Sequence, residues 1–301
     1  TRYRVEGLWP SEGRVMLAAA AKSGKTTMVA ANLIPALVDG VPFLGHHAAQ
    51  PVTGSVVLLN MEVGENTIRR WMRQAGIGAP ERVVVANLRG KATALALGSE
   101  AGRRRLATFL RSHEAEVVIL DPLAPVLAAH GLDENANADV ATFFAWWSEA
   151  LGLAGVLDDV IVHHTGHAGE RSRGASRLLD EPDAIWTMTK DAEESDDGYT
   201  TLTPTRYLAA YGRDVDLPQQ ALAYDPETRR LTLTGQGKGK AAENKAERAV
   251  RKLMADGAPR TASGICDAIG GSRNPIWEAV KRMAGTGDLE PTSGRGKGQF
   301  Y

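Results

Sequence analysis

The sequence predicts an α/β fold with a mostly parallel central sheet, followed by β-hairpins and a small helical domain. Three observations predict it. Short apolar runs alternate with helix-like segments over residues 14–166, short strand-like runs replace them after residue 184, and a Gly/Lys/Ala-rich stretch lies at 235–243. Continuous apolar strands separated by helices are typical of a parallel sheet that is covered on both faces.

The individual elements follow from the same periodicities. The apolar runs expected to form the parallel sheet are 14–20, 55–62, 82–88, 116–121 and 156–166. The helical patterns between them lie at 25–40, 65–76, 100–113 and 138–151. Beyond residue 184, short strands and hairpins are predicted by "AIWTMTKD", "YTTLTPTRYLAAYG", "ALAYDP" and "RRLTLTG". We therefore predict a first domain over residues 1–234.

The C-terminal residues have a different pattern. Three amphipathic helices are predicted by "NKAERAVRKLMADG", "TASGICDAIG" and "SRNPIWEAVKRMAGTG", with Thr261 or Ser263 as the N-cap of the second. The last stretch, "DLEPTSGRGKGQFY", resembles a short β-wing. This order predicts a winged helix-turn-helix domain over 244–301, joined to the first domain by a linker over 235–243.

Composition excludes several classes of protein. The 301 residues carry a net charge of −1, so there is no global basic field of the kind that marks a nucleic-acid binder. The single cysteine, Cys266, excludes an internal disulfide and a Cys-rich metal cluster. No charge-free apolar run reaches membrane-spanning length, and "TRYRVEGLWP" does not resemble a signal peptide. We expect a cytoplasmic protein.

Residues 18–27, "AAAAKSGKTT", contain the end of a phosphate-binding loop. The pattern of such loops, G-x-x-x-x-G-K-[ST], is met at every fixed position except the first, where Ala19 replaces glycine. Gly24 allows the backbone to bend around a phosphate, Lys25 supplies charge to the β- and γ-phosphates, and Thr26 supplies a hydroxyl ligand for Mg²⁺. Only the least demanding position departs from the pattern.

The context of this loop favours a nucleotide site. An apolar strand precedes it and a helix begins at the lysine, so backbone N–H groups and the helix dipole point at the anion. The alternative is one alanine-rich helix that contains Gly-Lys-Thr by chance, and it would bury a glycine in mid-helix. The residues that we expect to bind ATP are Ala21, Lys22, Ser23, Gly24, Lys25, Thr26 and Thr27.

Two acidic residues end apolar strands. Asp121 ends "VVILD" and is the candidate for the acid that holds Mg²⁺ together with Thr26. Glu62 ends "VVLLNME", where a carboxylate is well placed to polarise the attacking water. A strand-capping aspartate and a helix-capping glutamate are the alternative interpretations, and the neighbouring phosphate loop favours the catalytic ones.

The tract "VHHTGH", residues 162–167, follows a further strand. Three close histidines suggest a zinc site, but the H-E-x-x-H spacing is missing, and a polar residue at this strand tip is instead placed to contact a γ-phosphate. The next stretch, 168–177, carries Arg171, Arg173 and Arg177. Such a loop suits a nucleic-acid backbone or the ATP of a neighbouring subunit, and a solvated surface loop is the alternative.

Taken in order, these motifs resemble the RecA-like P-loop ATPases of the RepA type, the hexameric replicative-helicase ATPases of plasmids, phages and other mobile elements. The resemblance covers about residues 5–234 and rests on "KSGKTT", "NME", "ILDPL", "GLDENANADV", "VHHTGHAGERSRGASRLLDEPDAIW" and "YLAAYGRDVD". It implies a RecA-like core, ATP and Mg²⁺ as ligands, a homohexamer with single-stranded DNA in its central channel, and a replication partner such as a primase.

The resemblance also implies roles for individual residues. Lys25 and Thr26 would bind ATP and Mg²⁺, Asp121 would be the Walker B acid, Glu62 would activate water, and His163 would sense the γ-phosphate. Family members carry a basic residue that completes a neighbouring subunit's site, either after the 168–177 loop or on a later strand. Acids follow the loop here, so the candidates for this finger, in order of preference, are Arg213, Arg206 and Arg177.

Basic residues outnumber acidic ones in the predicted winged helix. The residues expected to contact DNA from its recognition helix and wing are Arg273, Lys281, Arg282, Arg295 and Lys297. A protein-docking winged helix is the alternative. The leading functional hypothesis is an ATP-driven, DNA-associated motor. A RecA-like recombination or regulatory ATPase that does not unwind DNA, and a nucleotide-switched DNA-binding regulator, are the other two.

Overall fold

A computed structural model describes residues 2–20, 23–165, 176–190, 205–270, 273–292 and 299–301. The chain divides into two compact units, residues 1–189 with 207–234 and residues 190–206 with 235–301. Within the described residues, no helix is long and apolar enough to cross a bilayer.

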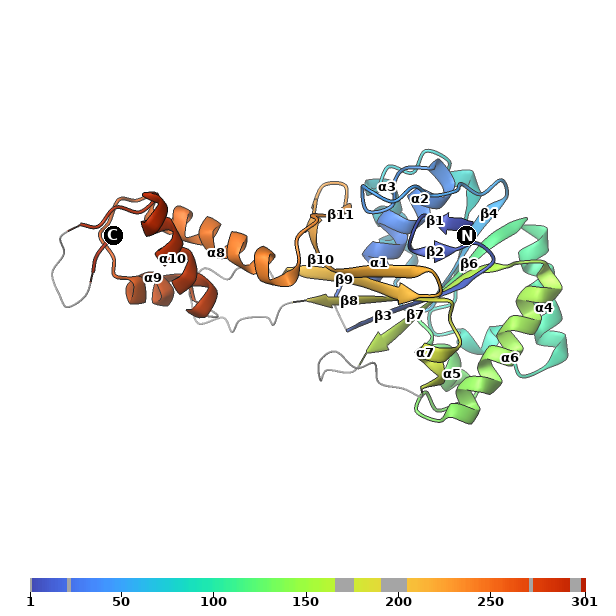
Figure 1. Cartoon of the computed structure of the whole chain (residues 1–301). Helices are drawn as coiled ribbons and strands as arrows, with labels where there is room; N and C mark the ends of the chain where they lie inside the picture. The colour runs from blue at the N-terminus through green and yellow to red at the C-terminus, as the bar shows by residue number, and fades with distance from the viewer. Residues whose placement is uncertain (1, 21–22, 166–175, 191–204, 271–272, 293–298) are drawn as a thin grey trace. The chain divides into compact units, whose positions relative to one another are not determined.

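The first unit is built on one large sheet (Figure 1). Among the described residues, nine strands form it in the order β11-β10-β9-β8-β3-β7-β6-β4-β5. Their bounds are β3 Arg14–Ala20, β4 Ser55–Asn60, β5 Val83–Asn87, β6 Ala115–Asp121, β7 Asp158–Thr165, β8 Ala184–Lys190, β9 Arg206–Gly212, β10 Val215–Tyr224 and β11 Leu231–Leu233. The strands from β3 to β8 pair in parallel, which confirms the predicted mostly parallel sheet, and β10 pairs antiparallel with β11.

Helices cover both faces of the sheet (Figure 1). One face carries α1 Lys25–Met28, α2 Ile34–Asp39 and α3 Glu65–Gln74. The other carries α4 Glu100–Ser112, α5 Ala124–Ala129, α6 Asn137–Ala154 and α7 Arg177–Asp180. Short 3₁₀ turns lie at Pro80–Arg82 and Ala92–Leu95, and a two-stranded pair, β1 Tyr3–Val5 and β2 Trp9–Pro10, precedes the sheet. The four predicted helical patterns of this region all correspond to helices.

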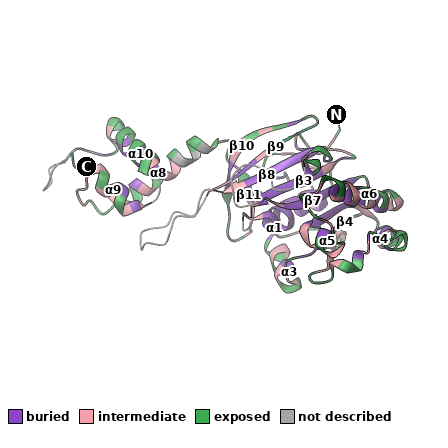
Figure 2. Ribbon diagram, turned by 90° about the horizontal axis from the view of Figure 1, so that it is seen from below, coloured by how far each residue is buried: buried purple, intermediate pink, exposed green. Residues whose placement is uncertain are grey.

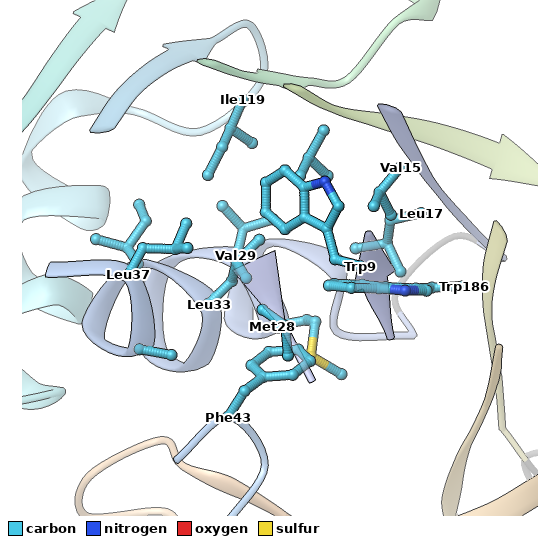
Figure 3. Close-up of a cluster of buried hydrophobic side chains, with 14 of the residues drawn as sticks. Trp9, Val15, Leu17, Met28, Val29, Leu33, Leu37, Phe43, Ile119 and Trp186 are labelled. Atoms are coloured by element: carbon cyan, nitrogen blue, oxygen red, sulfur yellow. The ribbon is translucent and has the colours of Figure 1, made fainter. Parts of the chain in front are cut away.

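The strands are buried on both faces, as Figure 2 shows. Along β3, Val15 and Leu17 belong to the core under α1 to α3, whereas Met16 belongs to the core on the opposite face. Two tryptophans fill the first core, where the Trp186 ring stacks on Phe43 at 5.2 Å between centroids and its indole nitrogen donates to a backbone carbonyl at 2.9 Å (Figure 3). The same core includes Met28 and Val29, which closely follow the phosphate loop.

The helix predicted over 25–40 is interrupted by a π-helical turn at Val29–Leu33. Asn32 explains it, because its side-chain amide donates to the Thr27 carbonyl at 3.0 Å and its Oδ1 accepts from the Leu231 N–H at 2.7 Å. Pro35, which lacks an N–H, follows in the first turn of α2. Such turns cluster at functional sites.

The second unit contains three helices in its described part, α8 Lys238–Met254, α9 Ala262–Ile269 and α10 Arg273–Thr286. They share a separate core that includes Val250, Ile265 and Val280. Thr261 caps α9, since its side chain accepts from the Gly264 N–H, and it also forms an antiparallel bridge with Phe300. The winged-helix interpretation stays a prediction.

One boundary differs from the predicted one. Helix α8 begins at Lys238, so most of the predicted linker over 235–243 is helical. The physical reason is that lysine and alanine, which follow Gly237, are strong helix formers, and they outweigh the single glycine inside the segment.

Candidate nucleotide-binding site

The phosphate loop joins β3 to α1. Gly24 has a φ of 103°, in the left-handed region that favours glycine, and α1 begins at the next residue. Ser23 is fully buried, and its hydroxyl donates to the Ala20 carbonyl at 2.8 Å. Two residues expected to bind ATP, Ala21 and Lys22, lie outside the described residues. The described part of the loop has the backbone that the phosphate-binding prediction requires.

Lys25 is buried at the start of α1. Its Nζ donates to the carbonyls of Ala19 at 3.0 Å and Ala20 at 3.2 Å, and lies 2.7 Å from Nδ1 of His164. Burial lowers the pKa of Lys25 to about 8, although the charges of Asp121 and Glu62 oppose this shift. The contacts of the Lys25 ammonium are thus two backbone carbonyls and an imidazole nitrogen, which are weak acceptors that an anion can replace.

Asp121 ends β6 with only 2% of its surface exposed. Burial raises the pKa of its carboxyl to about 6, against the lowering effects of a hydrogen bond from Thr26 and of the Lys25 charge. One carboxylate oxygen, Oδ1, has no hydrogen-bond partner in the described part of the chain. A buried carboxylate with one unpartnered oxygen, next to a threonine hydroxyl, offers the oxygen ligands that Mg²⁺ prefers, so Thr26 and Asp121 fit that ion.

Glu62 follows β4 and is the exposed member of the site. Its Oε2 lies 3.5 Å from His164 Nε2, and its side chain is 57% exposed. Burial, followed by the charge of Lys25, lowers the pKa of His164 although Glu62 acts in the opposite direction. Because Lys25 can only donate, the neutral imidazole accepts at Nδ1 and presents its Nε2–H to Glu62. His164 therefore links the phosphate-loop lysine to the candidate base.

The two adjacent histidines face opposite layers of the molecule. Val160 and Val162 belong to the core under α1 to α3, and His164 has the same parity along β7. Ile161 belongs to the opposite core, and His163, which is 1% exposed, shares its parity. Sequence reasoning named His163 and missed His164. In the sequence, only the alternation of side chains along β7 could have separated the two histidines. Because the neighbouring residues are apolar on both faces, that alternation does not show which histidine faces the phosphate loop.

A pair of asparagines shapes the loop that carries Glu62. The Asn60 amide donates to the Val63 carbonyl at 2.6 Å and to Asn87 Oδ1 at 2.8 Å, while its Oδ1 accepts from the Val63 N–H at 3.1 Å. Asn60 also lies opposite Asp121 in the register of β4 and β6. These bonds fix the loop between β4 and α3, and Asn60 is a positioning residue that the sequence did not reveal.

Of the arginines proposed for the trans finger, Arg213 lies at the opposite end of the sheet from the phosphate loop of its own chain. Arg213 follows β9, and its Nη1 donates to Asp183 Oδ1 at 2.6 Å beside the start of β8. That position is the amino end of the parallel strands, whereas the phosphate loop is at the carboxyl end. Arg206 begins β9 and Arg177 begins α7. Arg171 and Arg173 lie outside the described residues.

The basic residues of α10 are paired with acids. Arg273 contacts Asp267 at 2.7 Å and Lys281 contacts Glu278 at 3.3 Å. Arg282 contacts two glutamates of α8, at 2.6 and 3.3 Å. Arg295 and Lys297 lie outside the described residues. A nucleic acid bound to α10 would have to replace these exposed ion pairs, which contribute little to stability.

Clusters of metal-binding side chains were sought in the described part of the chain. Across the described ranges, no group of three or more His, Cys, Asp or Glu side chains is arranged to hold a metal ion. His167, the third histidine of the "VHHTGH" tract, lies outside those ranges.

Comparison with known families gives one match. Residues 1–170, more than half of the chain, match a family model described as an AAA domain. The match includes the phosphate loop, Glu62, Asp121 and all of β7. A search of curated proteins found no match.

Proposed function

The chain belongs to the AAA domain family, and from that premise we propose that it is an ATP-hydrolysing, DNA-associated motor that works as a ring-shaped homo-oligomer. Proteins of this family are P-loop ATPases, so nucleotide binding and hydrolysis follow from membership. The motor function, the DNA partner and the replicative-helicase role are the proposal. They are supported by the resemblance of the "VHHTGHAGERSRGASR" tract to RepA-type ATPases and by the separate, basic C-terminal unit.

One observation carries the hydrolytic part of the proposal. His164 contacts both Lys25 and Glu62, and Asp121 is hydrogen-bonded by Thr26, so four segments distant in sequence meet at the carboxyl end of the sheet. In the open α/β sheets of nucleotide-binding proteins, ligands bind at this end.

The chain's own residues would divide the reaction among them. Lys25 would leave its carbonyl partners to neutralise the β- and γ-phosphates. Thr26 and Asp121 would hold Mg²⁺, and the ion would supply positive charge for the phosphate oxygens. The Glu62 carboxylate orients the attacking water and accepts its proton. The Nε2–H of His164 points at Glu62, so this imidazole orients the base while it contacts the lysine that binds the phosphate.

The direct test is the ATPase rate of the full chain with and without single-stranded DNA. We expect DNA to stimulate turnover, and we expect Lys25→Ala and Glu62→Gln to abolish it. Glu65→Gln is the matched control, because Glu65 is an exposed acid three residues away whose carboxylate binds only Arg69 on its own helix among the described contacts. An ATPase rate that DNA leaves unchanged contradicts the motor function. A wild-type protein that does not hydrolyse ATP contradicts the ATPase activity.

The trans finger is tested on the same assembly. We expect Arg213→Ala to lower kcat by about 10³-fold with little change in ATP affinity, the effect typical of such arginines. If Arg213→Ala is active and Arg206→Ala or Arg177→Ala is not, the finger belongs to that residue. Mass determination with bound nucleotide then gives the number of subunits, for which we propose six.

A nucleotide-switched DNA-binding regulator is the second candidate. It is favoured by the independent core of the second unit and by Trp277, whose side chain is 39% exposed on α10. Tryptophan is enriched among the interface residues that contribute most to binding. Sequence-specific binding of duplex DNA by the full chain, with a turnover that DNA does not change, would favour the regulator over the motor.

A further inference from the structure

Thr27, the residue after the proposed Mg²⁺ ligand Thr26, is held by two side chains from outside the phosphate loop. Its carbonyl accepts from Asn32 Nδ2 at 3.0 Å, and its hydroxyl accepts from Arg229 Nη2 at 2.9 Å. Thr27 is 9% exposed, and Arg229 lies 202 residues away in the chain. The backbone directly after Thr26 is therefore fixed by side chains of two other segments.

Asn32 connects this part of α1 to the central sheet. The Asn32 side chain is buried, and besides its bond to Thr27 its Oδ1 accepts from the Leu231 N–H at 2.7 Å, at the start of β11. Strand β11 belongs to the nine-stranded sheet through its pairing with β10. The amide thus joins the first turn of α1 to the sheet, and an apolar side chain in its place would leave a buried N–H and a buried carbonyl without these partners.

The π-helical turn at Val29–Leu33 brings Asn32 to Thr27. Five residues along a regular α-helix correspond to a rotation of about 140°, which would direct the side chain of residue 32 away from residue 27. A π-turn is wider and brings residues five apart onto nearly the same side of the helix. The turn therefore serves the bond between Asn32 and Thr27, and such turns frequently occur at functional sites.

Thr26 lies between two residues that are both fixed. Before it, the Lys25 ammonium is held by two backbone carbonyls of β3, and after it stands Thr27. The Thr26 hydroxyl is hydrogen-bonded to Asp121, whose Oδ1 has no partner in the part of the chain that the structure describes. The direction of this hydroxyl depends on the backbone of the first turn of α1, because that turn carries it.

We propose that Asn32 is a positioning residue for the Mg²⁺ of this ATP site. Through the Thr27 carbonyl it fixes the first turn of α1, so that the Thr26 hydroxyl stays against the Asp121 carboxylate. Residues that orient metal ligands from outside set the affinity for the metal, commonly by about 10–100-fold. The inference rests on the proposed function, because it assumes that a nucleotide binds with Mg²⁺ at the phosphate loop.

The test measures how much Mg²⁺ strengthens the binding of ADP, which lacks the γ-phosphate and is not turned over. Calorimetry on the full chain gives the dissociation constant of ADP in excess Mg²⁺ and in EDTA, and the ratio of the two isolates the contribution of the metal. We expect Asn32→Ala to reduce this ratio by about tenfold and to leave the dissociation constant in EDTA within about twofold. Asn32→Leu, which has no amide but nearly the volume of asparagine, should give the same result and replaces Asn32→Ala if the cavity left by alanine prevents folding.

Ile34→Val is the matched control, because it removes buried hydrocarbon beside the same turn and no hydrogen bond. It should lower the free energy of unfolding and leave the ratio unchanged. If Asn32→Ala leaves the ratio unchanged, or weakens ADP binding equally with and without Mg²⁺, Asn32 only supports the fold and the inference is wrong. A wild type whose affinity for ADP does not respond to Mg²⁺ also contradicts it. If the wild type binds no ADP at all, the proposed ATPase function itself fails, which is a separate result.

Discussion

The buried aspartates at the two ends of the parallel strands differ in how completely they are paired. At the amino end of β7, Arg4 Nη2 contacts Asp158 at 2.7 Å and Arg14 Nε contacts Asp159 at 2.9 Å. The Trp147 indole N–H also donates to Asp159 at 2.9 Å. Both aspartates are 3% exposed, so each buried charge has a buried or half-buried partner. The ion pairs at this end of the sheet stabilise the fold.

The carboxyl end leaves its charged groups incompletely paired. Asp121 keeps one oxygen without a partner among the described residues, whereas no oxygen of Asp158 or Asp159 is left in that state. Burial raises the pKa of Asp121 and of Asp159 alike and lowers that of Lys25, so the two ends differ in their hydrogen-bond partners and not in burial. A buried ionisable group that lacks full compensation costs stability, and such groups persist where a ligand completes them. The two ends therefore differ in that Asp158 and Asp159 are paired with arginines within the fold, whereas Asp121 keeps one oxygen that a proposed ligand could complete.

The largest expected effect comes from removing one charge at each end. Asp121→Asn should lower kcat by about 10²–10³-fold, the cost of a lost electrostatic contact in a transition state, and should leave the free energy of unfolding unchanged or higher. Asp159→Asn should lower the free energy of unfolding by about 3 kcal/mol, because Arg14 becomes an unpaired buried charge. Urea denaturation and steady-state ATPase assays measure the two quantities on both variants.

The comparison breaks if the two variants exchange their effects. If Asp121→Asn strongly destabilises the protein, Asp121 stabilises the fold. If Asp159→Asn folds correctly but does not hydrolyse ATP, the amino end of the sheet is needed for activity. Asp158→Asn serves as the control for Asp159→Asn, since it removes a charge from the other buried pair of the same edge.

Most of the first unit could be predicted from the sequence because its strands are continuous apolar runs. Those same runs explain what could not be predicted. Since β7 is buried on both faces, its alternation carries no polar signal, and nothing in the sequence decides whether His163 or His164 faces the phosphate loop. Asn60 was equally hidden, because its role depends on the pairing of β4 with β5 and not on local pattern.

Long-range contacts were beyond local reasoning for the same physical reason. Arg229 reaches Thr27 across about two hundred residues of chain, and only the folded sheet brings the two together. Composition also did not reveal that most of the stretch 235–243 is helical, because the helix propensity of lysine and alanine outweighs that of the glycine within it. The phosphate loop, by contrast, is a contiguous motif whose geometry is set by Gly24 itself, so the sequence sufficed.

The second expected effect separates the two histidines. His164→Ala should lower kcat by about 10–100-fold, the range of a group that assists a general base, because it removes the contact between Lys25 and Glu62. His163→Ala should leave kcat of the folded protein within about twofold and act on stability instead. The reverse result would support His163 as the γ-phosphate sensor, the assignment that the family resemblance implies.

A smaller effect is expected at the loop that carries Glu62. Asn60→Ala removes both bonds to Val63, so Glu62 loses its fixed position, and kcat should fall by about tenfold while KM changes little. Asn87→Ala removes only the supporting bond to Asn60 and should have a lesser effect. Equal losses in the two variants, or a change confined to KM, would show that Asn60 does not position the base.

The smallest effect concerns stability at the ligand-binding end. Burial lowers the pKa of Lys25 from 10.5 to about 8, so folding penalises the charged ammonium. Lys25→Met keeps the length of the side chain and should raise the free energy of unfolding of the nucleotide-free protein by about 1–2 kcal/mol at pH 7, although it abolishes turnover.

The pH dependence of this gain follows from the sign of the shift. Below pH 8 the lysine is charged in both the folded and the unfolded protein, so wild type carries the full penalty and the gain from Lys25→Met is largest. As pH rises from about 8 to 10.5, the folded state loses the proton first and the penalty shrinks, until both states are neutral and the gain disappears. Urea denaturation of the two proteins at pH 7 and pH 10 measures this. If the gain does not depend on pH, methionine stabilises the site by packing. The buried charge of Lys25 then does not lower the free energy of unfolding.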